Sequence, residues 1–145
     1  MKIVLDFDWK DHQVVGSLTT EKEFKSLIFQ LQRAYAVNVK SVAPACLILA
    51  GISEEDKPHF DKVSGIENWK GVLRHEEPFE QVFEARKGDL VYLTADADTT
   101  LERIDEKDIY IVGGIVDRNR FKVRPSRLKF GRQNSCFLNR TLRTS

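Results

Sequence analysis

The sequence predicts an α/β fold built on a mostly parallel sheet with flanking helices. Short apolar segments have the length and composition of buried strands, and amphipathic helical segments lie between them. This alternation is typical of βαβ units, whose crossover connections are right-handed. The chain of 145 residues is long enough for one domain with a hydrophobic core.

The first expected elements are a strand at residues 3–5 and a long helix that begins near residue 20. Thr20 and Glu23 have the spacing of a capping box. Apolar residues then recur at three- and four-residue steps, which predicts a helix face that packs on the sheet. These residues are Phe24, Leu27, Ile28, Leu31, Ala34 and Tyr35.

The rest of the body continues the same alternation. Glycine, proline and polar residues separate the apolar segments and mark the expected ends of each element. The expected elements are a strand at 44–50 that ends at Gly51, a polar helix at 53–63, a strand at 69–73, a short helix at 78–85, and two strands within 89–96 and 108–117.

Composition narrows the functional class. The chain is 41% apolar and 31% charged, which is usual for soluble globular proteins. No apolar stretch approaches the roughly 20 residues of a membrane span, and the N-terminus lacks the apolar region of a signal peptide. Cys46 and Cys136 do not form a metal-type cluster with the histidines at 12, 59 and 75. We therefore expect an intracellular protein with reduced thiols, no metal and no membrane contact.

Charge divides the chain into two parts. Residues 1–117 contain 22 acidic and 14 basic side chains, whereas residues 118–145 contain nine basic side chains and no acidic ones. We expect residues 1–117 to form the domain and residues 118–145 to form a poorly ordered basic tail. Such a tail either binds a polyanion or is simply solvated, and composition does not decide between the two.

Carboxylates follow the expected strands. Asp6 and Asp8 come directly after the first strand, where alternation would place them on one face. They are either pocket carboxylates or residues that cap the following turn. Asp96 and Asp98 pose the same choice after a later strand, where Thr94 is a further capping candidate.

Asp117 gives the strongest signal, because Gly113 and Gly114 interrupt the preceding apolar strand. A glycine pair there indicates that the backbone bends or that a ligand approaches it closely, although a helix-capping Asp is the alternative. Dinucleotide, nucleotide-triphosphate and hydrolase motifs are absent from the sequence. Carboxylates without a phosphate-binding loop favour a cationic or proton-donating substrate.

Three segments together resemble the Trm10 family of tRNA methyltransferases, which are SPOUT-type enzymes. They are residues 21–38, 91–96 and 110–119, and the resemblance covers most of residues 1–120 in the same order. It implies an enzyme that uses S-adenosyl-L-methionine to methylate N1 of the purine, usually guanine, at the ninth tRNA nucleotide. It further implies tRNA as the partner, a monomer, no metal requirement, and a location in the nucleus or cytoplasm.

The resemblance also assigns roles to individual residues. Asp117 matches the candidate general base, which would remove the N1 proton of guanine. Cofactor binding is expected at Gly113, Gly114, Thr94 and Asp96, and substrate binding at Asp6, Asp8, Lys25, Arg33, Lys40 and Asn119. For the three basic residues, a solvated helix surface is the alternative to contact with tRNA phosphates.

The C-terminal part departs from the family pattern. Family members continue through a helix, a strand and a C-terminal helix that close the trefoil knot and complete the cofactor pocket. Residues 121–145 show nothing similar. The sequence therefore predicts a truncated or altered C-terminus, an incomplete knot and impaired activity of this chain.

Two other functions stay open on the sequence. The first is a non-catalytic or vestigial RNA-binding protein, in which the basic tail binds RNA through charge. The second is a phosphohydrolase of the haloacid dehalogenase type, whose nucleophile, threonine and magnesium motifs are mimicked by the segments at Asp6, Thr94 and Asp117. Binding of S-adenosyl-L-methionine would distinguish the methyltransferase from both of these alternatives.

Overall fold

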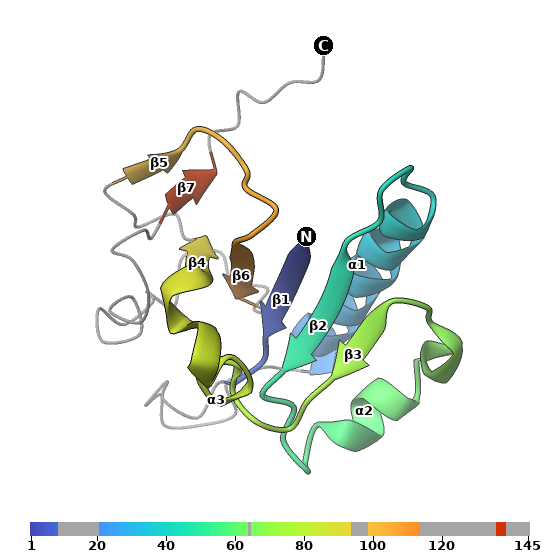
Figure 1. Cartoon of the computed structure of the whole chain (residues 1–145). Coiled ribbons are helices and arrows are strands. Elements are labelled where there is room, and N and C mark those ends of the chain that lie inside the picture. The colour runs from blue at the N-terminus through green and yellow to red at the C-terminus, as the bar shows by residue number, and fades with distance from the viewer. Residues whose placement is uncertain (9–20, 64, 94–98, 114–135, 139–145) are drawn as a thin grey trace.

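The computed structural model describes residues 1–8, 21–63, 65–93, 99–113 and 136–138. These residues form one seven-stranded sheet in which every strand pair is parallel, with the order β3-β2-β1-β6-β4-β7-β5 (Figure 1). The prediction of an α/β fold with a mostly parallel sheet is confirmed. The strands are β1 Lys2–Asp6, β2 Cys46–Ala50, β3 Val72–Arg74, β4 Leu90–Leu93, β5 Thr99–Leu101, β6 Ile109–Gly113 and β7 Cys136–Leu138.

Strand β1 lies in the interior of the sheet, between β2 and β6. Val4 is paired with Ile48 on one side and with Ile111 on the other, and all three side chains are at most 2% exposed. A parallel strand that is covered on both faces requires an almost continuous apolar sequence, and these three strands have one.

Helices cover both faces of the sheet. Helix α1 (Glu21–Val39) crosses behind the sheet in Figure 1, whereas α3 (Phe79–Val82) lies in front of it. Helix α2 (Lys57–Asp61) and the 3-10 helix η1 (Ile66–Asn68) pack on the α1 side, and the 3-10 helix η2 (Glu84–Asp89) follows α3. The sheet is therefore the middle of three layers.

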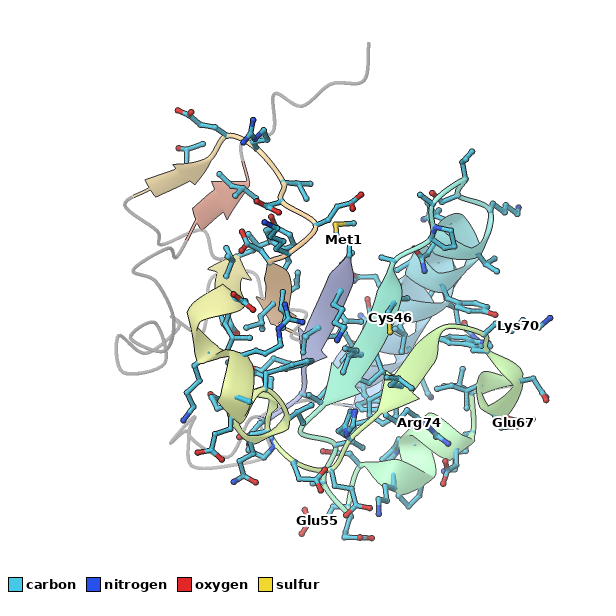
Figure 2. All side chains as sticks on the ribbon, in the orientation of Figure 1. Met1, Cys46, Glu55, Glu67, Lys70 and Arg74 are labelled. Carbon is cyan, nitrogen blue, oxygen red and sulfur yellow. The ribbon has the colours of Figure 1, made fainter. Side chains whose placement is uncertain are left out.

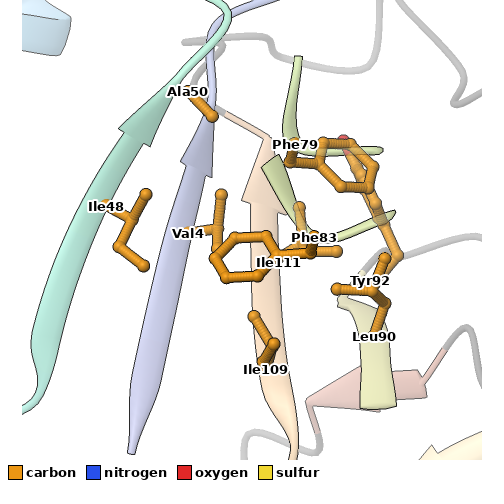
Figure 3. Close-up of a cluster of buried hydrophobic side chains, with 9 residues drawn as sticks. All are labelled: Val4, Ile48, Ala50, Phe79, Phe83, Leu90, Tyr92, Ile109 and Ile111. Atoms are coloured by element: carbon orange, nitrogen blue, oxygen red, sulfur yellow. The ribbon is translucent and has the colours of Figure 1, made fainter. Parts of the chain in front are cut away.

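The front face of the sheet is closed mainly by two aromatic rings. Phe79 and Phe83 lie on the strands as Figure 3 shows, and the ring of Phe79 is 5.9 Å from that of Tyr92. Alternate residues of four strands supply the rest of this cluster, as strand geometry requires. The cluster consists of Val4, Ile48, Ala50, Phe79, Phe83, Leu90, Tyr92, Ile109 and Ile111.

The back face is held by helix α1 and by an aromatic group centred on Phe60. The Phe60 ring meets Phe7 edge-on at 5.0 Å and Phe24 edge-on at 5.4 Å, a favoured geometry for aromatic pairs. These contacts join the end of β1, the start of α1 and α2. The whole cluster consists of Phe7, Phe24, Leu27, Leu31, Leu49, Ile52, Phe60, Val63 and Ile66.

The C-terminal end of α1 is tied to the amino end of β2. The Asn38 side-chain amide donates to the Ala45 carbonyl at 2.8 Å and accepts from the Ala45 N–H at 2.8 Å. This pair of bonds satisfies the backbone of Ala45 directly before β2. Helix α1 therefore runs against the strand direction, and its first turns lie near the carboxyl ends of the strands.

The predicted face of α1 is largely confirmed. Phe24, Leu27 and Leu31 are buried, and Ile28 packs against the back-face cluster. Ala34 is exposed, so the prediction was wrong at that position. Ala34 instead lines a hollow of about 510 Å³ between the C-terminal half of α1 and the apolar residues Ile3 and Leu5 of β1.

Three predicted elements have different bounds. The segment 53–56 is a turn in which Ser53 Oγ donates to Asp56 Oδ2 at 2.7 Å, and only Lys57–Asp61 is helical. Gly71 adopts a left-handed φ of 69°, so the third strand begins after it, at Val72. The helix predicted at 78–85 ends at Val82 and continues as the 3-10 helix η2.

Two strands were not predicted at all. β5 pairs with β7, and β7 joins β4 through Leu93 and Cys136. Both have three residues, and their alternation is too short to detect in the sequence. No helix among the described residues is long and apolar enough to cross a membrane.

Replacing Phe60 with alanine is expected to lower the free energy of unfolding by about 3–5 kcal/mol, because the lost ring leaves a cavity between α2 and the sheet. Phe60 is 1% exposed, whereas Phe29 on α1 is 60% exposed and provides the matched control. Phe29→Ala should change the free energy of unfolding by no more than about 0.5 kcal/mol. Urea denaturation measures both, and equal losses would contradict this description of the core.

Candidate active site

The candidate site lies at the carboxyl ends of β1, β6 and β4. Strands β2 and β3 extend the sheet from one side of β1, and β6 and β4 extend it from the other. Ligands of open α/β sheets bind outside the carboxyl ends of the strands where the strand order reverses in this way. Asp6 is paired with Gly113, the last residue of β6, and Val112 with Leu93, the last residue of β4.

Asp6 is the buried carboxylate of this edge, with 3% of its surface exposed. The backbone N–H of Asp8 donates to its Oδ1 at 3.0 Å, and the Tyr92 hydroxyl donates to its Oδ2 at 3.3 Å. A buried polar group requires such partners. The first bond is the turn-capping interaction that was one of the two interpretations of Asp6, and the second joins β1 to β4 across β6.

Tyr92 is a site residue that the sequence analysis missed. Its ring belongs to the front-face cluster, and its hydroxyl reaches the site edge. The available signal was a tyrosine inside a buried strand, because a buried tyrosine hydroxyl usually needs a hydrogen-bond partner.

Gly113 lies close to the Tyr92 hydroxyl. A Cβ atom at this position would lie 3.3 Å from the Tyr92 hydroxyl oxygen. Gly113 is an in-register strand residue, and the described glycines with positive φ are at positions 51, 65 and 71. The glycine pair was interpreted as a bend or as a place where a ligand approaches the backbone, whereas the close neighbour of Gly113 in the structure is the Tyr92 hydroxyl.

Gly51, which follows β2, packs directly against the segment after β1. Its φ is 78°, and a Cβ atom there would lie 2.6 Å from both the backbone nitrogen and the Cβ of Asp8. The Phe7 N–H also donates to the Ala50 carbonyl at 2.8 Å. Asp8, which is half-buried, is therefore positioned by direct backbone packing. The sequence marked Gly51 only as the end of a strand.

Several predicted site residues lie outside the described residues: Thr94, Asp96, Gly114, Asp117 and Asn119. The status of the knot also lies outside them. The described strands nevertheless end directly before these segments, with β4 ending at Leu93 and β6 at Gly113. Both strands therefore end at the edge that carries Asp6.

The predicted basic contacts are not gathered in one place. Lys25, Arg33 and Lys40 are all exposed, but Lys25 is in the second turn of α1 and Lys40 follows its last residue. At 1.5 Å per residue, the two positions are separated by about 22 Å along the helix axis. Only Lys25 lies near the carboxyl edge of the sheet. The Arg33 guanidinium lies 5.9 Å from the centre of the Phe29 ring.

A hollow beside the ends of β2 and β3 is lined by charged side chains that are paired with one another. Lys57 binds both Glu54 and Glu76, and Arg74 Nη1 lies 3.1 Å from Asp61 Oδ1. The hydrogen bond from Lys57 holds the pKa of the Glu54 carboxyl below its usual value, and the two glutamates raise the pKa of Lys57. These pairs connect α2 to the end of β3 and to the segment after it, and they form a structural ion-pair cluster.

No group of three or more metal-binding side chains occurs within the part of the chain that the structure describes. The chemistry of this edge is that of a buried carboxylate, a phenol and a half-buried glycine. Such an edge suits a ligand with positive charge, because a nearby carboxylate favours a cation.

Comparison with known proteins identifies the family. The family of the tRNA (guanine(9)-N(1))-methyltransferase TRM10/TRM10A matches residues 1–127. The chain belongs to this family. Residues 1–127 include every position that the sequence analysis assigned to catalysis, cofactor or substrate.

Individual relatives agree with the family assignment. The chain is 36% identical over 124 residues to a tRNA (guanine(9)-N1)-methyltransferase of Schizosaccharomyces pombe and 32% identical over 123 residues to human tRNA methyltransferase 10 homolog A. These regions cover 84% of the chain in each case, but only 39% and 34% of the two relatives. The chain therefore spans little more than a third of their length.

Solved structures share the fold. The full-length spTrm10–SAH complex has a TM-score of 0.74 and 36% identity, and the similarity covers 83% of this chain and 65% of that one. A dual-specific Trm10 from Thermococcus kodakaraensis has a TM-score of 0.64 at 20% identity, over 94% of this chain and 76% of that one. The second likeness shows the fold alone.

Gly51→Ala is expected to destabilise the protein more than Gly71→Ala by about 1–3 kcal/mol, because only the first substitution overpacks the segment after β1. Gly71 is a matched control, since its φ of 69° carries a similar conformational cost and nothing lies within 4 Å of a Cβ atom there. Urea denaturation compares the two variants. Equal destabilisation would mean that Gly51 is required for its φ alone.

Tyr92→Phe and Gly113→Ala are expected to be coupled. Removing the hydroxyl should cost about 1 kcal/mol or more through the lost hydrogen bond to Asp6. It also clears the space that a Cβ at position 113 needs, so the alanine should cost about 0.5–1 kcal/mol less in the phenylalanine background. A double-mutant cycle on the free energy of unfolding tests this contact. Strict additivity would contradict it.

Proposed function

We propose that this chain transfers a methyl group from S-adenosyl-L-methionine to N1 of guanine at the ninth nucleotide of tRNA. The observation that carries the proposal is the convergence of β1, β6 and β4 on one edge, where Asp6 pairs with Gly113 and both lie within the family match. The name of the Schizosaccharomyces pombe relative describes this methylation of guanine 9, and the name of the human relative describes a tRNA methyltransferase.

The cofactor assignment rests on one relative and on the site. The spTrm10 structure contains SAH, which is what remains when the methyl donor has given up its methyl group. The donor supplies an electrophilic methyl on a sulfonium cation. An edge with a buried carboxylate and no side chain at Gly113 fits such a group, and we assign Gly113, Gly114, Thr94 and Asp96 to its binding.

Asp117 is the proposed general base. N1 of guanine carries a proton at neutral pH, so the attacking lone pair becomes available when a base within hydrogen-bond reach accepts that proton. Asp117 follows β6 by four residues, and β6 is paired with the strand that carries Asp6. The Asp6 carboxylate accepts hydrogen bonds from Asp8 and Tyr92, and we propose that it orients this edge of the site.

The tRNA is the proposed partner, with phosphates near Lys25, Arg33 and Lys40 and further contacts from Asp8 and Asn119. Neutralised phosphates make binding dependent on salt, and they position the substrate without selecting its sequence. We propose that the chain acts as a monomer, which sedimentation of the purified chain tests directly. A dimer in solution would contradict the proposal that the chain acts as a monomer.

Asp117→Asn is expected to lower the single-turnover rate of methyl transfer to a guanine-9 transcript by roughly 100-fold or more, as loss of a general base does. Affinity for the methyl donor should stay nearly unchanged. The assay uses the 145-residue chain, labelled methyl donor and a tRNA transcript.

An adenine-9 transcript provides the control, because N1 of adenine has no proton to remove at neutral pH. Any activity on it should suffer less from Asp117→Asn. A guanine rate that does not change with the substitution would remove Asp117 as the base. Binding of tRNA by a wild-type chain that does not bind the methyl donor would instead favour the non-catalytic RNA-binding function.

A further inference from the structure

A groove of about 490 Å³ lies between helix α1 and the segment that contains α2. We call it the α1–α2 groove. It is distinct from the strand edge that carries Asp6, although the two are close, and it combines basic and aromatic side chains. Its lining residues are Phe24, Lys25, Ile28, Phe29, Gln32, His59, Lys62 and Val63.

Two lysines line the α1–α2 groove. Lys25 and Lys62 lie on its two sides, and none of the described lining residues carries a carboxylate. Residues 21–63, which contain α1 and α2, carry six basic and six acidic side chains, whereas residues 1–117 as a whole carry 22 acidic and 14 basic side chains. The pair of lysines, and not the net charge of the region, therefore fits an anionic ligand.

Phe29 differs from the other phenylalanine of the groove. Phe24 is 9% exposed, and its ring packs against His59 at 5.0 Å and Phe60 at 5.4 Å. Phe29 is 60% exposed, and Arg33 lies 5.9 Å from its ring centre. An exposed aromatic ring between cationic side chains is what proteins use to stack an unpaired nucleic-acid base.

The position of the groove connects it to the candidate active site. Phe7, the residue after Asp6, packs on Phe60 at 5.0 Å, and Phe60 packs on the groove residue Phe24. The first turns of α1 and helix α2 both follow the carboxyl ends of their preceding strands. The groove is therefore connected by packed aromatic rings to the segment that follows Asp6.

We propose that the α1–α2 groove binds an unpaired nucleotide of the substrate tRNA, with its base stacked on Phe29 and flanking phosphates bound by Lys25 and Lys62. This proposal rests on the proposed function and adds a second contact away from the methylated nucleotide. An acidic protein segment would also pair with the lysines, but it would not need the planar ring of Phe29.

Equilibrium binding of a tRNA transcript to the 145-residue chain tests the stacking contact. Phe29→Ala and Phe29→Leu should each weaken binding about tenfold, whereas Phe29→Trp should retain it, because every base stacks on an indole. Val37→Ala is the matched control, since Val37 is 73% exposed on the same helix and does not line the groove. Equal affinities for the Phe29 variants and this control would overturn the proposal.

The phosphate contacts are tested by salt dependence. The double variant Lys25→Gln, Lys62→Gln should weaken binding and reduce the slope of log affinity against log salt by roughly 1.4–1.8, the value for two lost phosphate contacts. Lys70→Gln is the control for charge, because Lys70 (labelled in Figure 2) is exposed before β3 and does not line the groove. A slope that changes as little in the double variant as in this control would overturn the phosphate assignment.

Methyl-transfer assays on the same proteins separate this proposal from the proposed function. If the chain transfers no methyl group but its Phe29 and lysine variants lose affinity for tRNA, the groove assignment stands and the proposed enzymatic function is wrong. If the chain is active but these variants bind tRNA as well as the wild type, the groove assignment is wrong and the enzymatic function stands. Binding of an acidic peptide that depends on the lysines but not on Phe29 would overturn the nucleotide assignment.

Discussion

The parallel pairing of β1 with β2 and β6 is the constraint on which the rest of the structure depends. It places Asp6 beside Ala50 on one side and Gly113 on the other. A shift of one residue would move Val4 from the front face to the back and turn Asp6 away from Tyr92, because successive side chains of a strand point to opposite faces. The apolar clusters on the two faces therefore set the register, and the register sets the geometry of the candidate site.

The candidate site and the α1–α2 groove are connected by packing. The buried carboxylate of Asp6 belongs to the same short segment as Phe7, whose ring anchors Phe60 and, through it, the start of α1 and helix α2. Close-packed aromatic rings transmit displacement because they have little free volume. A nucleotide held in the groove and a base held at the strand edge would thus be positioned by a single rigid group of side chains.

Polar side chains are used differently at the two ends of the sheet. At the amino end, Asn38 satisfies both backbone groups of Ala45 and serves only the fold. At the carboxyl end, the Tyr92 hydroxyl and the Asp6 carboxylate are bonded to each other beside Gly113, whose missing side chain leaves room for the hydroxyl. The ion pairs of Lys57 and Arg74 form a third group, in which charges are satisfied locally between the α2 region, the end of β3 and the segment after it. Among the described residues, the buried acid belongs to the arrangement at Asp6.

The sequence by itself determined the class of the fold, the central strands and the buried stripe of α1, because the apolar runs at β1, β2 and β6 and the periodicity of Phe24, Leu27 and Leu31 are local signals. It also indicated Asp6 and Gly113 as site residues. Only the tertiary structure decided that the Tyr92 hydroxyl reaches Asp6 from two strands away, that Gly51 packs on Asp8, and that Phe29 stands exposed beside Lys25 and Lys62. Each of these depends on residues far apart in the chain, and their contacts follow from strand order and register, which no local pattern encodes.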